Sequence, residues 1–132
     1  MTVRSASSIR VRYAETDQMG VAYHGGYFAW FEVGRTDLLR GHGCTYRELE
    51  AQGLRFPVIE ASARYLKPAL YDDLLEVHTR VTSVGHVRLA FAYEVRRAGT
   101  DGPLATGTTV HASLDAAGRP CRLPDDLRRR LG

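Results

Sequence analysis

Long hydrophobic runs, cysteine and lysine are scarce in this chain of 132 residues. No apolar run approaches the roughly 18–20 residues that a membrane-spanning helix needs, so the sequence predicts no membrane span. The N-terminal stretch MTVRSASSIRVR lacks the apolar segment of a secretory signal peptide. The two cysteines, Cys44 and Cys121, show no motif spacing and are typical of reduced thiols. Together these features favour a cytoplasmic protein.

Several motifs that carry chemistry are also missing. Neither a glycine-rich phosphate loop nor a G-x-S-x-G element is present, which excludes the nucleophile-elbow hydrolases. The spacing of His42, His78, His86 and His111 matches no metal site, so no metal ion is predicted. A net charge of +3, without an aromatic-and-basic binding motif, does not indicate nucleic-acid binding. A mildly basic surface does suit a ligand that carries phosphate.

The remaining composition is that of an ordinary globular protein. With 44% hydrophobic and 25% charged residues, the chain is not expected to be disordered. Its length is enough for one domain with its own core, and no repeat, linker or low-complexity tract divides it. We therefore expect a single domain over residues 1–132.

The most informative stretch runs from Tyr13 to Arg40. A strand is predicted over Ile9–Ala14, a loop containing Gly20 over residues 15–23, and a helix from about His24 to Arg40. One face of that helix is apolar: Tyr27, Trp30, Phe31, Gly34 and Leu38. Phe28 and Val33 widen the face until little polar surface is left, so other structure must surround the helix.

The rest of the chain is predicted to be mostly β-structure. Thr45 and Glu48 have the spacing of a capping box, which predicts a short helix ending near Gly53. Beyond it, apolar and polar residues alternate over four segments: 59–65, 75–81, 87–95 and 104–114. Gly85-His86 and Asp101-Gly102 mark hairpin turns. This order predicts an α+β fold, in which a curved antiparallel sheet of about five strands wraps a long central helix. Such a small sheet leaves edges to cover, which favours a homo-oligomer.

Asp17 is the first candidate for chemistry, because it lies in the turn just ahead of the apolar helix. A helix start offers unpaired backbone N–H groups and a partial positive charge. A carboxylate close to those groups suits hydrolysis of an acyl bond, since base and oxyanion donor share one short segment. From spacing alone, an aspartate that caps the helix or forms an Asx turn is an equal alternative.

The chain resembles the hotdog-fold acyl-CoA thioesterases, specifically the 4-hydroxybenzoyl-CoA thioesterase family and its relatives encoded beside the Tol–Pal system. The resemblance spans roughly residues 8–115. It is carried by these elements: Arg10-Val11, Thr16-Asp17-Gln18-Met19-Gly20-Val21, Tyr23-His24, Tyr27, Glu32, Arg35-Thr36, Leu39, Tyr65-Leu66-Lys67-Pro68-Ala69-Leu70 and Asp73-Leu74-Leu75-Glu76-Val77. Gly25-Gly26 departs from the family, whose members usually carry Asn, Ser or Ala after the histidine position.

The resemblance implies an acyl-CoA thioesterase that needs neither metal nor organic cofactor. It implies that Asp17 is the catalytic carboxylate, as base or as nucleophile, and that the backbone N–H of His24 polarises the thioester carbonyl. It further implies sites between two subunits, in dimers that often pair into tetramers. A structural role for the His24 imidazole stays open.

Besides Asp17 and His24, the sequence contains candidates for substrate binding. Tyr23, Gly25 and Tyr27 are candidates for lining the pocket, although both tyrosines also fit a packing role. The phosphates of coenzyme A normally meet exposed basic residues, and the candidates are Arg64, Lys67, His86 and Arg88. Glu32 and Arg35 are three apart and can pair on the helix. A catalytic role for Glu32 is the less favoured interpretation.

Two rival functions fit the same fold. One is a non-catalytic module that binds acyl-CoA or an acyl carrier. The other is a dehydratase of hydroxyacyl thioesters, an enzyme class that usually places a histidine ahead of the helix and an acid within it. Asp17 precedes the helix, which disfavours the dehydratase. The acyl group itself is not specified by the sequence.

Overall fold

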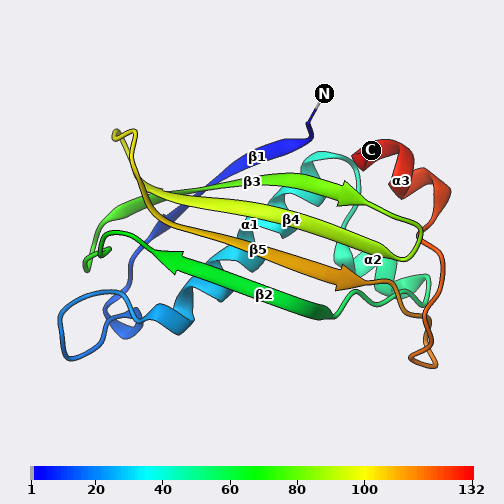
Figure 1. The fold of residues 1–132 in the computed structure, drawn as a ribbon, viewed down its shortest axis with the longest axis horizontal. Helices are drawn as coiled ribbons and strands as arrows, with labels where there is room; N and C mark the ends of the chain where they lie inside the picture. The colour runs from blue at the N-terminus through cyan, green and yellow to red at the C-terminus, as the bar shows by residue number, and fades with distance from the viewer. Residues whose placement is uncertain (1) are drawn as a thin grey trace.

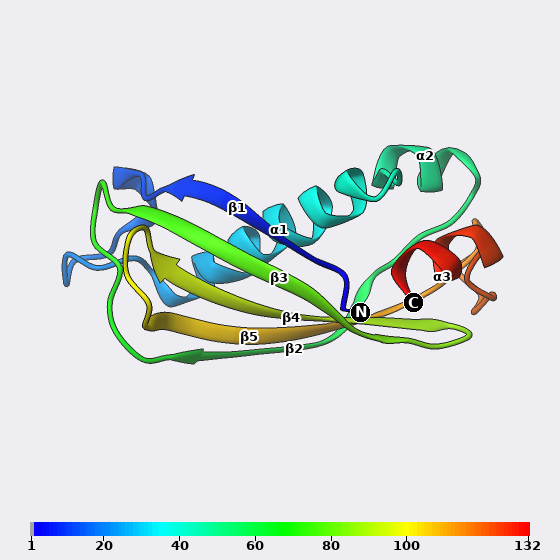
Figure 2. The same ribbon diagram turned by 90° about the horizontal axis from the view of Figure 1, so that it is seen from above.

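The computed structural model describes residues 2–132 and contains one antiparallel sheet with a long helix along one face (Figures 1 and 2). The strands pair in the order β1-β3-β4-β5-β2. Their bounds are β1 Arg4–Arg10, β2 Val58–Tyr65, β3 Leu74–Val84, β4 Arg88–Arg97 and β5 Pro103–Ala112. The sheet curves around α1 (Tyr27–Gly41), while α2 (Tyr46–Ala51) and α3 (Asp125–Leu131) lie at one end. The predicted five-stranded α+β architecture is confirmed.

The central helix begins as predicted, but its first turn is tighter than an α-helix. His24–Gly26 form a 3-10 turn, and the α-helix proper starts at Tyr27. Gly34 lies directly against β3, where an added Cβ would collide with Thr79 and Val77. A glycine at this position therefore lets the helix approach the sheet closely.

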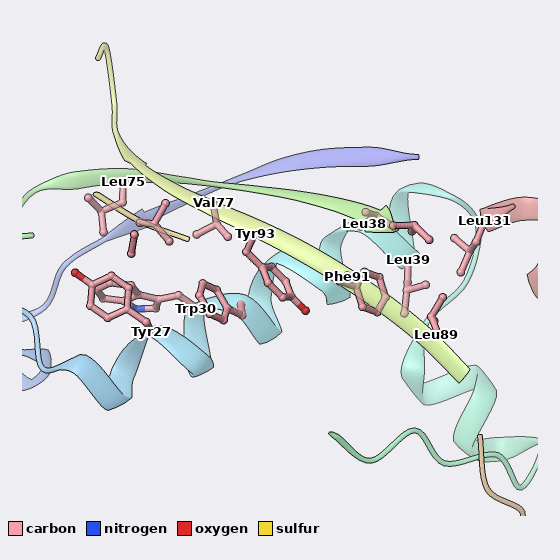
Figure 3. Packing of buried hydrophobic residues seen from close by; sticks show 14 of the residues in the cluster. Tyr27, Trp30, Leu38, Leu39, Leu75, Val77, Leu89, Phe91, Tyr93 and Leu131 are labelled. Atoms are coloured by element: carbon pink, nitrogen blue, oxygen red, sulfur yellow. The ribbon is translucent and has the colours of Figure 1, made fainter. Parts of the chain in front are cut away.

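The core fills the space between α1 and the middle of the sheet (Figure 3). The ring of Phe31 stacks on that of Tyr93 with centroids 4.4 Å apart, and Phe91 lies next to Tyr93. Each large apolar side chain buried in this way contributes about 1.5–3 kcal/mol to stability. The alternation that predicted β3 and β4 corresponds to a buried face and a more exposed face.

The first strand is displaced from its predicted position. Sequence alternation predicts Ile9–Ala14, whereas β1 covers Arg4–Arg10 and Tyr13–Glu15 form a short 3-10 turn. The cause is local, because the carboxylate of Glu15 accepts a hydrogen bond from the backbone N–H of Arg12 at 2.8 Å. This contact turns the chain out of the sheet after Val11.

The helix is surrounded less completely than its apolar sequence predicts. Phe28 and Val33 are 37% and 41% exposed, on the side of α1 away from its buried face. The neighbouring strand β2 is an edge strand that pairs only with β5, and seven of its eight residues are exposed. One chain alone therefore leaves an apolar side open along α1 and β2.

The short second helix has the predicted cap. Thr45 Oγ1 accepts a hydrogen bond from the backbone N–H of Glu48 at 3.1 Å. None of the helices within residues 2–132 is both long and apolar enough to cross a membrane.

Candidate active site

The loop ahead of α1 folds back on itself as a small hairpin. Thr16 forms an antiparallel bridge with Ala22, and the backbone N–H of Asp17 donates to the carbonyl of Val21 at 3.0 Å. The turn closes at Gly20, whose φ of +78° lies in the left-handed region that glycine adopts without strain. Asp17 is thereby held at the turn end of the hairpin, with little freedom of its backbone.

The carboxylate of Asp17 is half-buried, and it forms an Asx turn. Its Oδ1 accepts a hydrogen bond from the backbone N–H of Met19 at 2.9 Å. Within the described chain, its other oxygen has no hydrogen-bond partner. The Asx turn expected as an alternative role for Asp17 is thus formed by one carboxylate oxygen, while the second stays free for a substrate or water.

A partly buried contact ties this hairpin to the helix. The indole Nε1 of Trp30 donates to Glu15 Oε2 at 2.9 Å, and the backbone N–H of Tyr23 donates to the Glu15 carbonyl at 2.8 Å. Burial acts to raise the pKa of Glu15, but hydrogen bonds from Arg12 and Trp30 outweigh it and hold that pKa below its ordinary value. The ionised Glu15 therefore fixes the position of the hairpin relative to α1.

The start of the helix is fixed from the other side by the end of β2. The hydroxyl of Tyr65 donates to the carbonyl of His24 at 2.7 Å, and the Tyr65 ring packs edge-on against Tyr27, with centroids 5.1 Å apart. In the described residues, the backbone N–H of His24 donates no hydrogen bond. The result is a rigidly held, unpaired N–H group at a helix start, which is the feature that an oxyanion needs.

The aromatic residues at this helix start play different parts. Tyr23 is half exposed, and its ring lies over Gly25, where an added Cβ would come within 2.7 Å of the ring. Tyr27 is only 2% exposed and packs against Trp30, so of its two open roles the structure favours packing. The space beside Gly25 is thus filled by the Tyr23 side chain of the same protein.

The basic candidates are divided between the two ends of the sheet. Lys67 follows β2 and is at the end that holds Asp17, since Ala22 bonds to nearby Ala69. His86 and Arg88 lie at the turn between β3 and β4, near α3 at the opposite end (Figure 1). A single subunit therefore places Lys67, but not His86 or Arg88, at the same end as Asp17.

In residues 2–132, no group of three or more His, Cys, Asp or Glu side chains is placed to hold a metal ion. The pairing of Glu32 with Arg35 is present but loose, with Oε2 and Nη2 3.9 Å apart. The Glu32 side chain points largely to solvent, whereas that of Arg35 is mostly buried.

Sequence reasoning gave Tyr65 and Glu15 no part in holding the site. The signal available for Tyr65 was its place at the end of an alternating strand, but its contact with His24 joins residues 41 positions apart. Glu15 borders Thr16-Asp17, and its contact with Trp30 depends on how the hairpin folds onto the helix.

A five-stranded antiparallel sheet curved around one long helix (Figure 2) is the arrangement of the hotdog-fold thioesterases. The chain matches the thioesterase-like superfamily over residues 11–131 and belongs to this family. It is 40% identical over 91 residues to the putative acyl-CoA thioesterase YneP of Bacillus subtilis, covering 69% of this chain and 66% of that protein. It is 38% identical over 87 residues to the acyl-CoA thioester hydrolase YbgC of Escherichia coli, covering 66% of this chain and 65% of that protein.

Solved structures show the same similarity. A hypothetical protein of Thermus thermophilus, TT1821, superimposes with a TM-score of 0.91 at 40% identity, covering 96% of both chains. The DHNA-CoA thioesterase of Staphylococcus aureus superimposes with a TM-score of 0.87 at 36% identity, covering 91% of this chain and 80% of that one. The resemblance identified from the sequence is confirmed.

Proposed function

We propose that this protein hydrolyses acyl-CoA thioesters to a carboxylic acid and free coenzyme A. The observation that supports this most is the pairing of two features on one rigid segment: the free carboxylate oxygen of Asp17 and the unpaired N–H of His24. The relatives named as acyl-CoA thioesterases support the same reaction.

The chemistry follows from the charges that develop in the reaction. When an oxygen nucleophile adds to the thioester carbonyl carbon, the carbonyl oxygen becomes an anion. The His24 N–H and the helix dipole stabilise that anion. As a base, Asp17 takes a proton from the attacking water; the C–S bond then breaks, and the CoA thiolate is protonated as it leaves. As a nucleophile, Asp17 forms a mixed anhydride that water opens in a second step. Both routes give the same products.

We also propose that the working form is a dimer joined through β2. This strand has an unpaired edge and exposed apolar side chains, Val58, Ile59 and Tyr65. A two-fold axis perpendicular to the sheet would pair the two β2 strands antiparallel and continue the sheet. The same axis would cover Phe28 and Val33 with the second subunit. Two such dimers can pair again into the homotetramer expected from the resemblance.

The dimer gives the distant basic residues a role. Antiparallel pairing places the Val58 end of one β2 beside the Tyr65 end of the other. The turn that carries His86 and Arg88 in one subunit then lies toward the helix start of its partner. Lys67 of one subunit together with His86 and Arg88 of the other would meet the phosphates of coenzyme A. We propose action in the cytoplasm, which suits the two free thiols Cys44 and Cys121.

The test is a thiol-release assay with several acyl-CoA esters, run beside calorimetric titration of a non-hydrolysable acyl-CoA analogue. We expect free thiol to appear catalytically, and light scattering to give at least a dimer. Tight binding of the analogue with no thiol released would instead support the non-catalytic acyl-CoA or acyl-carrier binding module. A monomer that retains full turnover would contradict the proposed subunit interface.

A further inference from the structure

The loop between β2 and β3, residues 66–73, supports the hairpin that lies ahead of α1. The backbone N–H of Ala22, in the hairpin, donates to the carbonyl of Ala69 at 2.8 Å. Val21 forms an antiparallel bridge with Leu70 beside it. Figure 2 shows both segments together at the left-hand end of the sheet. The hairpin and the β2–β3 loop therefore form one layer, so a shift of the loop would also shift the hairpin.

Two side chains, Asp73 and Arg97, hold this loop to the sheet. Oδ2 of Asp73 accepts a hydrogen bond from the backbone N–H of Leu70 at 2.8 Å. The same oxygen accepts from Nε and Nη2 of Arg97, at the end of β4, at 3.2 and 3.0 Å. Nη2 of Arg97 also donates to the carbonyl of Pro68 at 3.3 Å. The guanidinium thus joins the end of β4 to the loop at two points.

The pair of Asp73 and Arg97 is charged and only partly open to water. The two side chains are 20% and 38% exposed, respectively. Burial acts to raise the pKa of Asp73, but hydrogen bonds from Leu70 and Arg97 outweigh it and hold that pKa below its ordinary value. Asp73 is therefore ionised at neutral pH, and its hydrogen bonds with Leu70 and Arg97 are charge-assisted.

The backbone next to this pair has a conformation that needs support from its neighbours. Among the described residues, Asp72 is the one non-glycine residue in the left-handed region, with a φ of +70°. Such a conformation costs free energy, persists where surrounding contacts fix it, and is frequent at functional sites. Here the backbone N–H of Asp72 donates to the carbonyl of Val11 at 2.9 Å, and Arg10 Nη1 donates to the carbonyl of Asp72 at 2.8 Å. The turn that leads into Asp73 is thereby fixed.

The position of the hairpin matters because Asp17 and the His24 N–H must approach one carbonyl group together. Glu15 joins the hairpin to α1 on one side, and the β2–β3 loop supports it on another. A displacement of about 1 Å in a catalytic group can cost about 100-fold in rate. In the described part of the chain, neither Asp73 nor Arg97 bonds to the proposed reacting groups. The pair can therefore act on them only through the loop.

We propose that Asp73 and Arg97 are positioning residues for the reaction. They hold the β2–β3 loop against the hairpin, and so align Asp17 with the His24 N–H. This inference rests on the proposed thioesterase function and adds two residues outside the reacting centre. Without the Arg97 guanidinium, the Pro68 carbonyl loses its donor and the hairpin keeps only one firm support.

The test removes the guanidinium in Arg97→Met. We expect kcat, measured by thiol release and expressed per folded molecule, to fall about ten-fold, because Asp17 is then held less precisely. KM should change by no more than about two-fold, since the groups proposed to contact the substrate are all retained. A pair that only stabilises the fold would lower the free energy of unfolding and leave kcat unchanged.

Two further changes test the pair itself. Arg97→Lys keeps a positive charge beside Asp73 and should recover part of the lost kcat. Asp73→Asn keeps an oxygen for the Leu70 N–H but weakens the link to Arg97, so kcat should again fall. The double variant Asp73→Asn/Arg97→Met should be no slower than Arg97→Met alone, because both changes break the same link.

Arg96→Met is the matched control, since Arg96 is the neighbour of Arg97 in β4 and pairs with Glu94. It should keep the wild-type kcat. If Arg97→Met does not fold, as judged by its melting curve, Asp73→Asn serves in its place and must show the fall in kcat. Wild-type kcat in the folded variant would overturn the inference, as would a double variant in which the two losses multiply. Absence of thiol release from the wild-type protein would count instead against the proposed function.

Discussion

Strands β4 and β2 belong to one sheet but have opposite surroundings. β4 lies between β3 and β5, and its inward residues Leu89, Phe91, Tyr93 and Val95 are all buried against the helix. β2 pairs on one side only, and even its apolar residues are largely exposed in the single chain. The middle of the sheet thus holds the domain together, whereas the β2 edge and the adjoining helix start carry the groups that we propose for binding and catalysis.

This division has a physical basis. Residues in the middle have the neighbours that close packing requires, so the free energy of burying their side chains is already gained within one chain. At the edge, the contacts of Tyr65 and Glu15 fix the helix start and its hairpin. Among the described residues, one oxygen of the Asp17 carboxylate and the His24 N–H are left without a hydrogen-bond partner. Mutations in the middle should therefore change stability, and mutations at the edge should change turnover.

The largest effect is expected from Asp17→Asn. The amide can keep the hydrogen bond from Met19, but it cannot act as base or nucleophile, so kcat should fall by roughly 100- to 10,000-fold. Thiol release measures the loss, and circular dichroism and light scattering should show unchanged fold and assembly. Asp101→Asn, in the exposed turn between β4 and β5, is the control and should keep full activity. Near wild-type turnover in Asp17→Asn would contradict the proposal that the edge of the sheet carries the catalytic groups.

The converse change is Phe91→Ala in the middle of the sheet. Removing this fully buried ring should lower the free energy of unfolding by about 3–5 kcal/mol. Urea unfolding measures the change, and kcat per folded molecule should stay near that of the wild type. Val87→Ala, at an exposed position next to the same strand, should change stability by no more than about 0.5 kcal/mol. The division fails if Phe91→Ala abolishes turnover while stability is unaffected.

Acid should destabilise the middle through His111. Burial lowers the pKa of His111 from 6.5 to about 4, so the folded state disfavours the charged form. The contribution of neutral His111 is complete above pH 6.5 and is lost as the pH falls toward 4, a change of about 3 kcal/mol. The free energy of unfolding of the wild type, minus that of His111→Val, should be flat above pH 6.5 and decline below it. Parallel curves for the two proteins over the whole range would contradict this.

The smallest effect is expected from Tyr65→Phe, which tests whether turnover depends on the support of the helix start. The variant loses the hydroxyl that holds the His24 carbonyl, an interaction worth about 1 kcal/mol, so kcat should fall about five-fold. Tyr71→Phe, an exposed tyrosine outside this contact, should have no effect on kcat. An unchanged kcat in Tyr65→Phe would show that the helix start does not need this support.

The sequence predicted the features that depend on local periodicity. The central helix, the alternation of β3, β4 and β5, and the Thr45 cap all follow from residues close together in the chain. The start of β1 could not be predicted, because Ser5, Ser7 and Ser8 give no apolar alternation and their strand is defined by pairing with β3. The contact of Tyr65 with His24 and the hydrogen bond between Tyr93 and Thr109 join different elements of the fold, and no single segment encodes them.

The candidate site was predictable in part for the same reason. Asp17, Tyr23 and His24 lie within one short loop, so their shared position follows from the sequence. The distribution of Lys67, His86 and Arg88 over two ends of the sheet depends on topology and appears only in the folded chain.

The most direct test is a crystal structure with a ketone analogue of an acyl-CoA, in which a methylene replaces the thioester sulfur. We expect the carbonyl oxygen to lie 2.7–3.1 Å from the backbone nitrogen of His24. We also expect the Asp17 carboxylate to approach the carbonyl carbon from the other side. A carbonyl oxygen bound elsewhere, with the Asp17 carboxylate directed into solvent, would contradict the proposed mechanism.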